Sequence, residues 1–137
     1  MIGLFLLQAG LGAIGPQALP PRGCAAFLWS RGDEPRLVAM VGAEPGTLRL
    51  RLDGKPLVLA RVGTEGAVLR GIAAMSRYAV GGVSATLTLS ATDRPDLTDG
   101  ALVGDATLTV DQAGQDTVVA PVGGLIGCAP DTGGRGK

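Results

Sequence analysis

Few side chains in this sequence could perform acid–base or nucleophilic chemistry. The 137 residues include no histidine, which excludes Ser-His, Cys-His and histidine–metal schemes. The chain has four serines, and Lys55 and Lys137 are the only lysines that could activate one of them as a base. Neither lysine stands in a Ser-x-x-Lys arrangement, and no carboxylate pair is marked as a general acid and base. The sequence therefore predicts that the protein is not an enzyme.

Three aspartates spaced three residues apart are the candidate oxygen ligands for a metal ion. Asp93, Asp96 and Asp99 precede Gly100, and a hard cation such as Ca²⁺ takes several oxygen ligands from one loop. The spacing lacks the Asp-x-Asp-x-Asp-Gly order and the late glutamate of an EF-hand loop. Because aspartate also favours turns, we interpret the segment as a turn, with a cation site as the alternative.

Four arginines could form a patch for an anionic partner. Arg49 and Arg51 alternate with leucines, and Arg61 and Arg77 follow further along the chain. An envelope protein with an acidic surface, a lipid headgroup or an anionic polymer would suit such a patch. The alternative is a solvated face that discourages edge pairing. The formal net charge is zero and only 3% of the residues are aromatic, so nucleic-acid binding is not expected.

A glycine pattern near the N-terminus matches the dinucleotide-binding fingerprint. Residues 10–15 read Gly-Leu-Gly-Ala-Ile-Gly, but the phosphate site requires a helix that opens at these glycines. Pro16 and Pro20 prevent a useful helix there. We therefore predict no bound cofactor.

The first residues have the character of a secretory leader. An apolar run at 2–7 follows the first Met, and no charged side chain appears before Arg22. The run is too short to span a membrane but fits the apolar region of a signal peptide. It lacks a basic n-region and a clean Ala-x-Ala site, and a buried N-terminal strand is the alternative. We predict a leader and proline-rich spacer over 1–22, with no transmembrane span in the mature chain.

The two cysteines stand near the two ends of the remaining chain. Cys24 opens the predicted mature domain, and Cys128 lies close to its end. An even number of cysteines in an exported chain favours a disulfide, which predicts a periplasmic or extracellular location. The alternative is a cytosolic protein with two buried free thiols.

Hydrophobic residues recur with a period of two, which is typical of strands. Leucines alternate with arginines over 47–52, and the dipeptide Asp53-Gly54 is the strongest short hairpin signal in the chain. Both turn positions need a positive φ, which aspartate and glycine tolerate. A two-residue turn brings the leucines of the two strands onto one face, in the pairs Leu50 with Leu57 and Leu48 with Leu59.

Further short strands are expected along the rest of the chain, at residues 24–30, 36–41, 83–90, 106–110 and 117–120. Residues 64–76 combine a helical spacing of apolar side chains with two glycines, and we favour an irregular strand over a short helical turn. About seven to nine short strands predict one all-β domain over 23–130, an antiparallel β-sandwich or barrel. Residues 131–137 lack an apolar anchor and are expected to form a flexible tail.

One known family shares part of this pattern. The chain resembles the periplasmic inhibitors of C-type lysozyme in the order Cys24, Ser76-Arg77-Tyr78, Ala85-Thr86-Leu87 and Cys128. Those inhibitors are small exported β-barrels with a terminal-to-terminal disulfide, and a Ser-Gly-x-x-Tyr loop and a Trp-x-Lys-Gly segment carry the inhibition. Here Arg77 stands where the family has glycine, and the Trp-x-Lys-Gly segment is absent.

These observations together predict an exported, non-enzymatic module that binds a partner or associates with the cell envelope. The resemblance implies one alternative, an inhibitor of a cell-wall-degrading enzyme. A small-ligand binder or an enzyme of unknown type is the second alternative.

Overall fold

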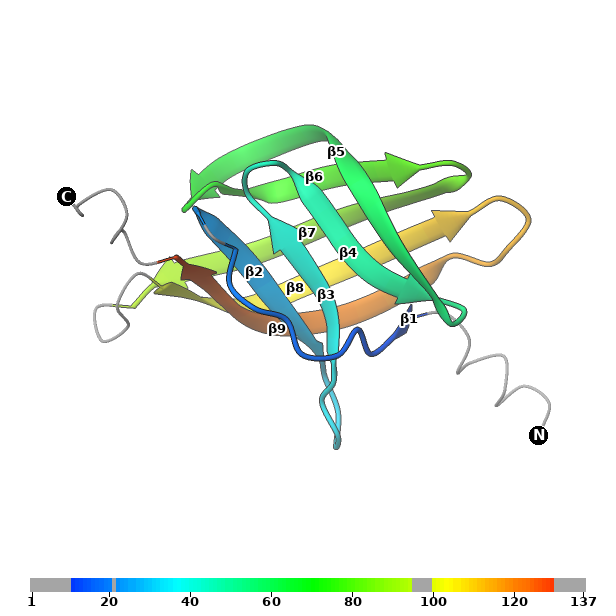
Figure 1. The fold of residues 1–137 in the computed structure, drawn as a ribbon, viewed down its shortest axis with the longest axis horizontal. Helices are drawn as coiled ribbons and strands as arrows, with labels where there is room; N and C mark the ends of the chain where they lie inside the picture. Colours follow the sequence, from blue (N-terminus) through cyan, green and yellow to red (C-terminus); the bar gives the residue numbers. More distant parts are fainter. Residues whose placement is uncertain (1–10, 21, 95–99, 130–137) are drawn as a thin grey trace.

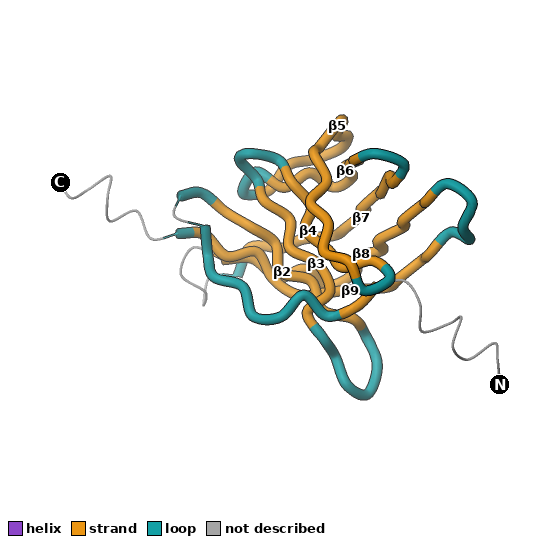
Figure 2. Tube along the Cα trace, turned by 45° about the vertical axis from the view of Figure 1, so that its right-hand side comes forward, coloured by secondary structure: helices purple, strands orange, loops and turns teal. Residues whose placement is uncertain are grey.

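The computed structural model describes residues 11–20, 22–94 and 100–129, and these residues form nine strands and no helix (Figures 1 and 2). The predicted tail at 131–137 lies outside the described residues. The strands are β1 (Leu11–Gly12), β2 (Cys24–Ser30), β3 (Leu37–Gly42), β4 (Thr47–Leu52), β5 (Lys55–Leu69), β6 (Ile72–Val80), β7 (Val83–Asp93), β8 (Gly100–Gln112) and β9 (Val118–Cys128).

Eight of these strands close into an antiparallel barrel. Each strand from β2 to β8 pairs with the next strand in the chain, and β9 pairs back onto β2 (Figure 1). The short strand β1 adds to β4 at Arg51 and Leu52. The all-β prediction is therefore confirmed, and of the two predicted architectures the protein adopts the barrel.

The hairpin predicted at Asp53-Gly54 is confirmed in its turn and its register. Asp53 and Gly54 have φ values of 51° and 82°, which are the left-handed values that this turn requires. The strands β4 and β5 pair through the predicted partners, including Leu48 with Leu59 and Leu50 with Leu57.

Residues 64–76 form strand and turn, as the favoured interpretation predicts. They complete β5 and begin β6, which meet at a two-residue turn of Arg70 and Gly71. The β5–β6 register shifts twice, between Arg61 and Gly63 and between Glu65 and Val68. The second bulge falls within the segment and makes its apolar spacing irregular, because the extra residue breaks the alternation of the strand.

Aliphatic side chains fill the interior of the barrel, as expected for eight strands. Alternate residues along a strand point inward, and all eight barrel strands supply fully buried side chains, among them Leu28, Val41, Leu48, Leu59, Tyr78, Leu87, Leu108 and Ile126. The interior is therefore a packed core, and a binding site has to lie at the rim or on the outside of the barrel.

Glycines at the closing seam let β9 approach β2 closely. A Cβ atom added at Gly124 would clash with the carbonyl oxygen of Phe27 and would lie 3.0 Å from the ring of Trp29. Only glycine fits at such a close approach of two backbones. Because the seam joins the first and last barrel strands, this glycine is part of what allows the barrel to close.

The segment between β1 and β2, residues 13–20, runs along the outside of the barrel (Figure 2). Ile14 N–H donates a hydrogen bond to the carbonyl oxygen of Leu37, and Gln17 Oε1 accepts one from Arg49. Leu19 and Phe27 both lie over Gly127. Part of the predicted leader thus packs against the outer face of β2 to β4, while residues 1–10 lie outside the described part of the chain.

Candidate functional site

The predicted disulfide joins the two strands that close the barrel. Cys24 on β2 and Cys128 on β9 are directly opposite in the ladder, with their Cα atoms 3.9 Å apart, and their sulfur atoms are bonded. The bridge therefore links the first barrel strand to the last, at the end of the seam.

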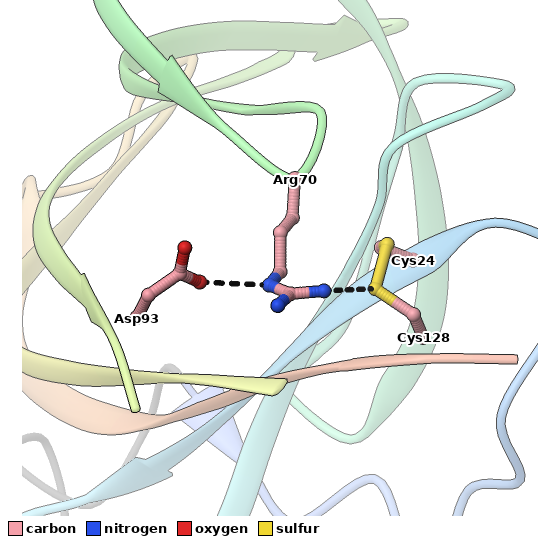
Figure 3. Close-up of a disulfide and its surroundings, with 4 residues drawn as sticks. All are labelled: Cys24, Arg70, Asp93 and Cys128. Atoms are coloured by element: carbon pink, nitrogen blue, oxygen red, sulfur yellow. Dashed lines mark hydrogen bonds and ion pairs between the residues drawn. A yellow bond between two sulfur atoms is a disulfide. The ribbon is translucent and has the colours of Figure 1, made fainter. Parts of the chain in front are cut away.

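A cation lies beside this disulfide (Figure 3). Arg70, in the β5–β6 turn, points its Nη1 at Cys128 Sγ over 3.7 Å, and its Nε donates a 2.9 Å hydrogen bond to Asp93 Oδ1. Arg70 holds this position with a φ of 54°, a left-handed conformation that is unfavourable for a residue with a side chain. Arg70 is not one of the four arginines of the predicted basic patch.

The aspartates proposed as metal ligands are only partly within the described residues. Asp93 forms an ion pair with Arg70, whereas Asp96 and Asp99 lie outside the described part of the chain. Among the residues that the structure describes, no group of three or more Asp, Glu, His or Cys side chains is placed to hold a metal ion.

The four arginines predicted to form a basic patch have intramolecular contacts, and they do not share one face. Arg61 pairs in register with the buried Tyr78, so it lies on the inner side of the wall at the rim. There it donates to the carbonyl oxygen of Ala43. Arg49 and Arg51 lie on β4 beside the N-terminal segment, and Arg77 lies 3.7 Å from a carboxylate oxygen of Glu65.

Ser76 and Tyr78, which stand at the Ser and Tyr positions of the inhibitory loop in the resemblance to lysozyme inhibitors, are inside the barrel. Ser76 is 2% exposed and Tyr78 is 1% exposed, so neither side chain can enter the cleft of another protein in this state. Burial raises the pKa of the Tyr78 hydroxyl, while its hydrogen bond with Ser76 and the nearby charge of Arg61 act in the opposite direction. These groups form a satisfied polar pair within the core.

A cavity of about 730 Å³ opens at the rim opposite to the disulfide. Such a volume lies within the range of ligand-binding pockets. Its walls come from β1, from the loop that joins β2 to β3, and from the first residues of β9. The lining residues are Leu11, Gly12, Ala13, Ser30, Arg31, Glu34, Arg36, Val38, Val118, Val119, Ala120 and Pro121.

One wall of the cavity is a strand edge without a neighbour. β9 begins at Val118, but its pairing with β2 begins only at Val122, where β2 ends. Residues 118–121 pair with β8 on one side and face the cavity on the other. We call residues 118–121 the open edge.

Hydrogen bonds along β2 show which main-chain groups the open edge presents. Ser30 N–H donates to Arg36 on the β3 side, whereas the Gly23 carbonyl accepts from Ala129 on the β9 side. The main-chain N–H and carbonyl groups of even-numbered β2 residues thus point toward β3, and those of odd-numbered residues point toward β9. Their partners on β9 are also odd-numbered, so the main-chain groups of Val119 and Pro121 point into the cavity.

The loop at residues 31–36 contributes two arginines to the lining of the cavity. Arg31 donates to the carbonyl oxygen of Gly104, and its side chain lies over Gly123. Arg36 lies 3.8 Å from Glu34, with both side chains largely exposed. Such an exposed pair contributes little binding energy, so the Arg36 guanidinium is free to exchange Glu34 for another carboxylate.

Sequence reasoning missed this site because it depends on unequal strand lengths at the closing seam. The one local signal was Pro121, since a proline in a strand marks a position whose missing N–H faces away from the ladder.

The described residues contain no helix long and apolar enough to cross a membrane. No family model, curated protein or solved structure matches the chain.

Proposed function

We propose that the protein is an exported, non-enzymatic binding module that holds an extended segment of a partner protein against the open edge of β9. The observation that carries this proposal is the cavity, because one of its walls is an unpaired strand edge. An exposed edge is a template for the addition of another strand.

The open edge offers a short but specific set of main-chain groups. Val119 presents both an N–H and a carbonyl, and Pro121 presents a carbonyl alone. An added antiparallel residue opposite Val119 can exchange two hydrogen bonds with it, and a further N–H of the segment can donate to Pro121. The proline limits the edge to a few bonds, which protects it against indiscriminate pairing.

The cavity walls define which side chains the segment would carry. Val118, Ala120 and Val38 give the cavity an apolar surface, which suits an aliphatic or aromatic side chain of the segment. Arg31 and Arg36 supply positive charge, which suits a carboxylate. We therefore propose a partner segment in which apolar residues alternate with at least one Asp or Glu.

Export is consistent with this function. The disulfide favours an oxidising compartment, and we predict that cleavage removes the first 13–23 residues. Cleavage in that window would remove Leu11, Gly12 and Ala13, which form one wall of the cavity. We propose that removal of the leader opens the site further.

Selection from a library of short random peptides against the immobilised, oxidised protein tests the proposal. Selected peptides should share the alternating apolar and acidic pattern and should bind Val119→Pro about threefold to tenfold more weakly, because this variant lacks one main-chain N–H. Val119→Pro removes no hydrogen bond to β8, since the Val119 N–H points into the cavity.

Val119→Thr is the matched control, because it keeps the N–H and the branched side chain and should retain binding. Circular dichroism of both variants checks that the barrel is intact. The proposal is wrong if no peptide is enriched over the empty support, or if the selected peptides bind the proline variant with unchanged affinity.

A further inference from the structure

The disulfide has an asymmetric environment. Figure 3 shows the Arg70 guanidinium directed at Cys128, and Arg70 Nη1 lies 3.7 Å from Cys128 Sγ. The other cysteine, Cys24, is partly buried and packs against the hydrophobic core. The bridge thus has a cationic side at Cys128 and an apolar side at Cys24.

The position of Arg70 is maintained against its backbone preference. The Arg70–Gly71 turn needs positive φ at both positions, and asparagine or glycine would satisfy the first of them without strain. Residues kept in such conformations often serve a functional site. The Arg70 side chain, which the turn places in this conformation, is the one that contacts Cys128 Sγ.

A nearby cation changes the chemistry of a cysteine sulfur. A thiolate next to arginine or lysine is stabilised, and the pKa of its thiol falls. In thiol–disulfide exchange, the sulfur with the lower thiol pKa leaves faster. Arg70 therefore makes Cys128 the better leaving group of the pair.

We propose that the Cys24–Cys128 bridge is a site of directed thiol–disulfide exchange, at which an external dithiol attacks Cys24 and expels Cys128. The thiolate of the dithiol forms a bond to Cys24 Sγ, and the electron pair of the broken S–S bond moves to Cys128, whose negative charge Arg70 stabilises. The second thiol of the dithiol, after losing its proton, attacks the mixed disulfide. Cys24 then leaves and takes a proton from water, and the dithiol becomes a disulfide.

The ion pair with Asp93 sets the strength of this effect. Asp93 holds the guanidinium in place through the Nε bond of 2.9 Å, but its negative charge also offsets part of the field at Cys128. Removal of the Arg70 charge and removal of the Asp93 charge should therefore change the pKa of the Cys128 thiol in opposite directions.

Exchange with glutathione identifies the sulfur that is attacked. The oxidised protein is treated briefly with reduced glutathione, the free thiols are blocked with N-ethylmaleimide, and the products are mapped by mass spectrometry. The proposal predicts glutathione on Cys24 and maleimide on Cys128 in most of the singly modified protein. Equal modification of the two cysteines, or glutathione mainly on Cys128, would overturn it.

Two charge variants test the role of Arg70. Arg70→Gln should slow the exchange and Asp93→Asn should accelerate it. A change of about one unit in the pKa of Cys128 corresponds to about a threefold change in rate, for a Brønsted slope of about 0.5. Arg70→Lys, which keeps the charge, should restore part of the rate and of the preference for Cys24.

Arg77→Gln is the control, because Arg77, on β6, is a partly exposed cation paired with Glu65 on β5. It should change neither rate nor preference. If Arg70 had a purely structural role, Arg70→Gln would change neither the rate of exchange nor the ratio of the two products. If Arg70→Gln fails to fold, Asp93→Asn still decides the matter, since an unchanged or lower rate in that variant contradicts the proposal.

Discussion

Replacing both Cys24 and Cys128 by alanine should lower the stability of the barrel without opening it. The bridge closes a loop with a sequence separation of 104, and the chain-entropy model assigns about 4.7 kcal/mol to a loop of roughly 100 residues. That figure is an upper value, because denatured chains retain structure. We expect a loss of about 2–4 kcal/mol in the free energy of unfolding.

The structure explains why the barrel should remain closed. Beyond the cysteine pair, β2 and β9 stay paired from Ala25 to Ser30, and the bridge acts mainly on the unfolded chain. For a domain of this size, the expected loss lowers Tm by on the order of 10 °C. The urea dependence of unfolding should also become steeper, since the unbridged chain exposes more surface.

Thermal and urea unfolding followed by circular dichroism measures both quantities. The oxidised protein, the reduced protein and the double alanine variant are compared, and the last two should agree. An unchanged Tm would refute the reasoning about loop closure. Loss of the strand signal before heating would refute the inference that the ladder alone keeps the seam closed.

Three further predictions concern the seam, the core tyrosine and the leader. Gly124→Ala should destabilise the fold by about 1–3 kcal/mol in urea unfolding, because its Cβ would meet the Phe27 carbonyl; an unchanged midpoint would contradict the close approach. Burial raises the pKa of Tyr78 above the ordinary value for tyrosine, so the unfolded state loses its proton first and the free energy of unfolding should fall as pH rises above about 10. Absorbance titration of this single tyrosine should show a raised midpoint, and Tyr78→Phe should remove its share of the slope; an ordinary midpoint would contradict burial. N-terminal sequencing of protein expressed in a bacterium should find the first 13–23 residues missing, and an intact Met1 on soluble cytoplasmic protein would contradict export.

The features that the sequence predicted correctly are those determined by local chemistry. The Asp53-Gly54 turn and the alternating leucines on both sides determine one register, since a slip of one residue would turn the leucines outward. The disulfide followed from the number and placement of the cysteines. The composition and spacing of the strands indicated an all-β domain.

The features that the sequence did not predict depend on how distant strands meet. The pairing of β9 with β2 makes the domain a barrel and not a sandwich, and no local sequence pattern predicts this pairing. The bulge between Arg61 and Gly63 breaks the alternation that sequence reasoning follows. The open edge exists because β9 extends beyond the end of β2, and the position of Arg70 beside Cys128 depends on a turn from a different part of the barrel.

The most direct test of the central claim is the hydrogen exchange of the Val119 and Ala120 amides, measured by NMR in the protein without a partner. The Ala120 N–H points toward β8, and the Val119 N–H points into the cavity. We expect the Val119 amide to exchange rapidly while the Ala120 amide is protected, and we expect a selected peptide to protect Val119. Protection of Val119 equal to that of Ala120 in the free protein would show that the edge is already paired and would contradict the account.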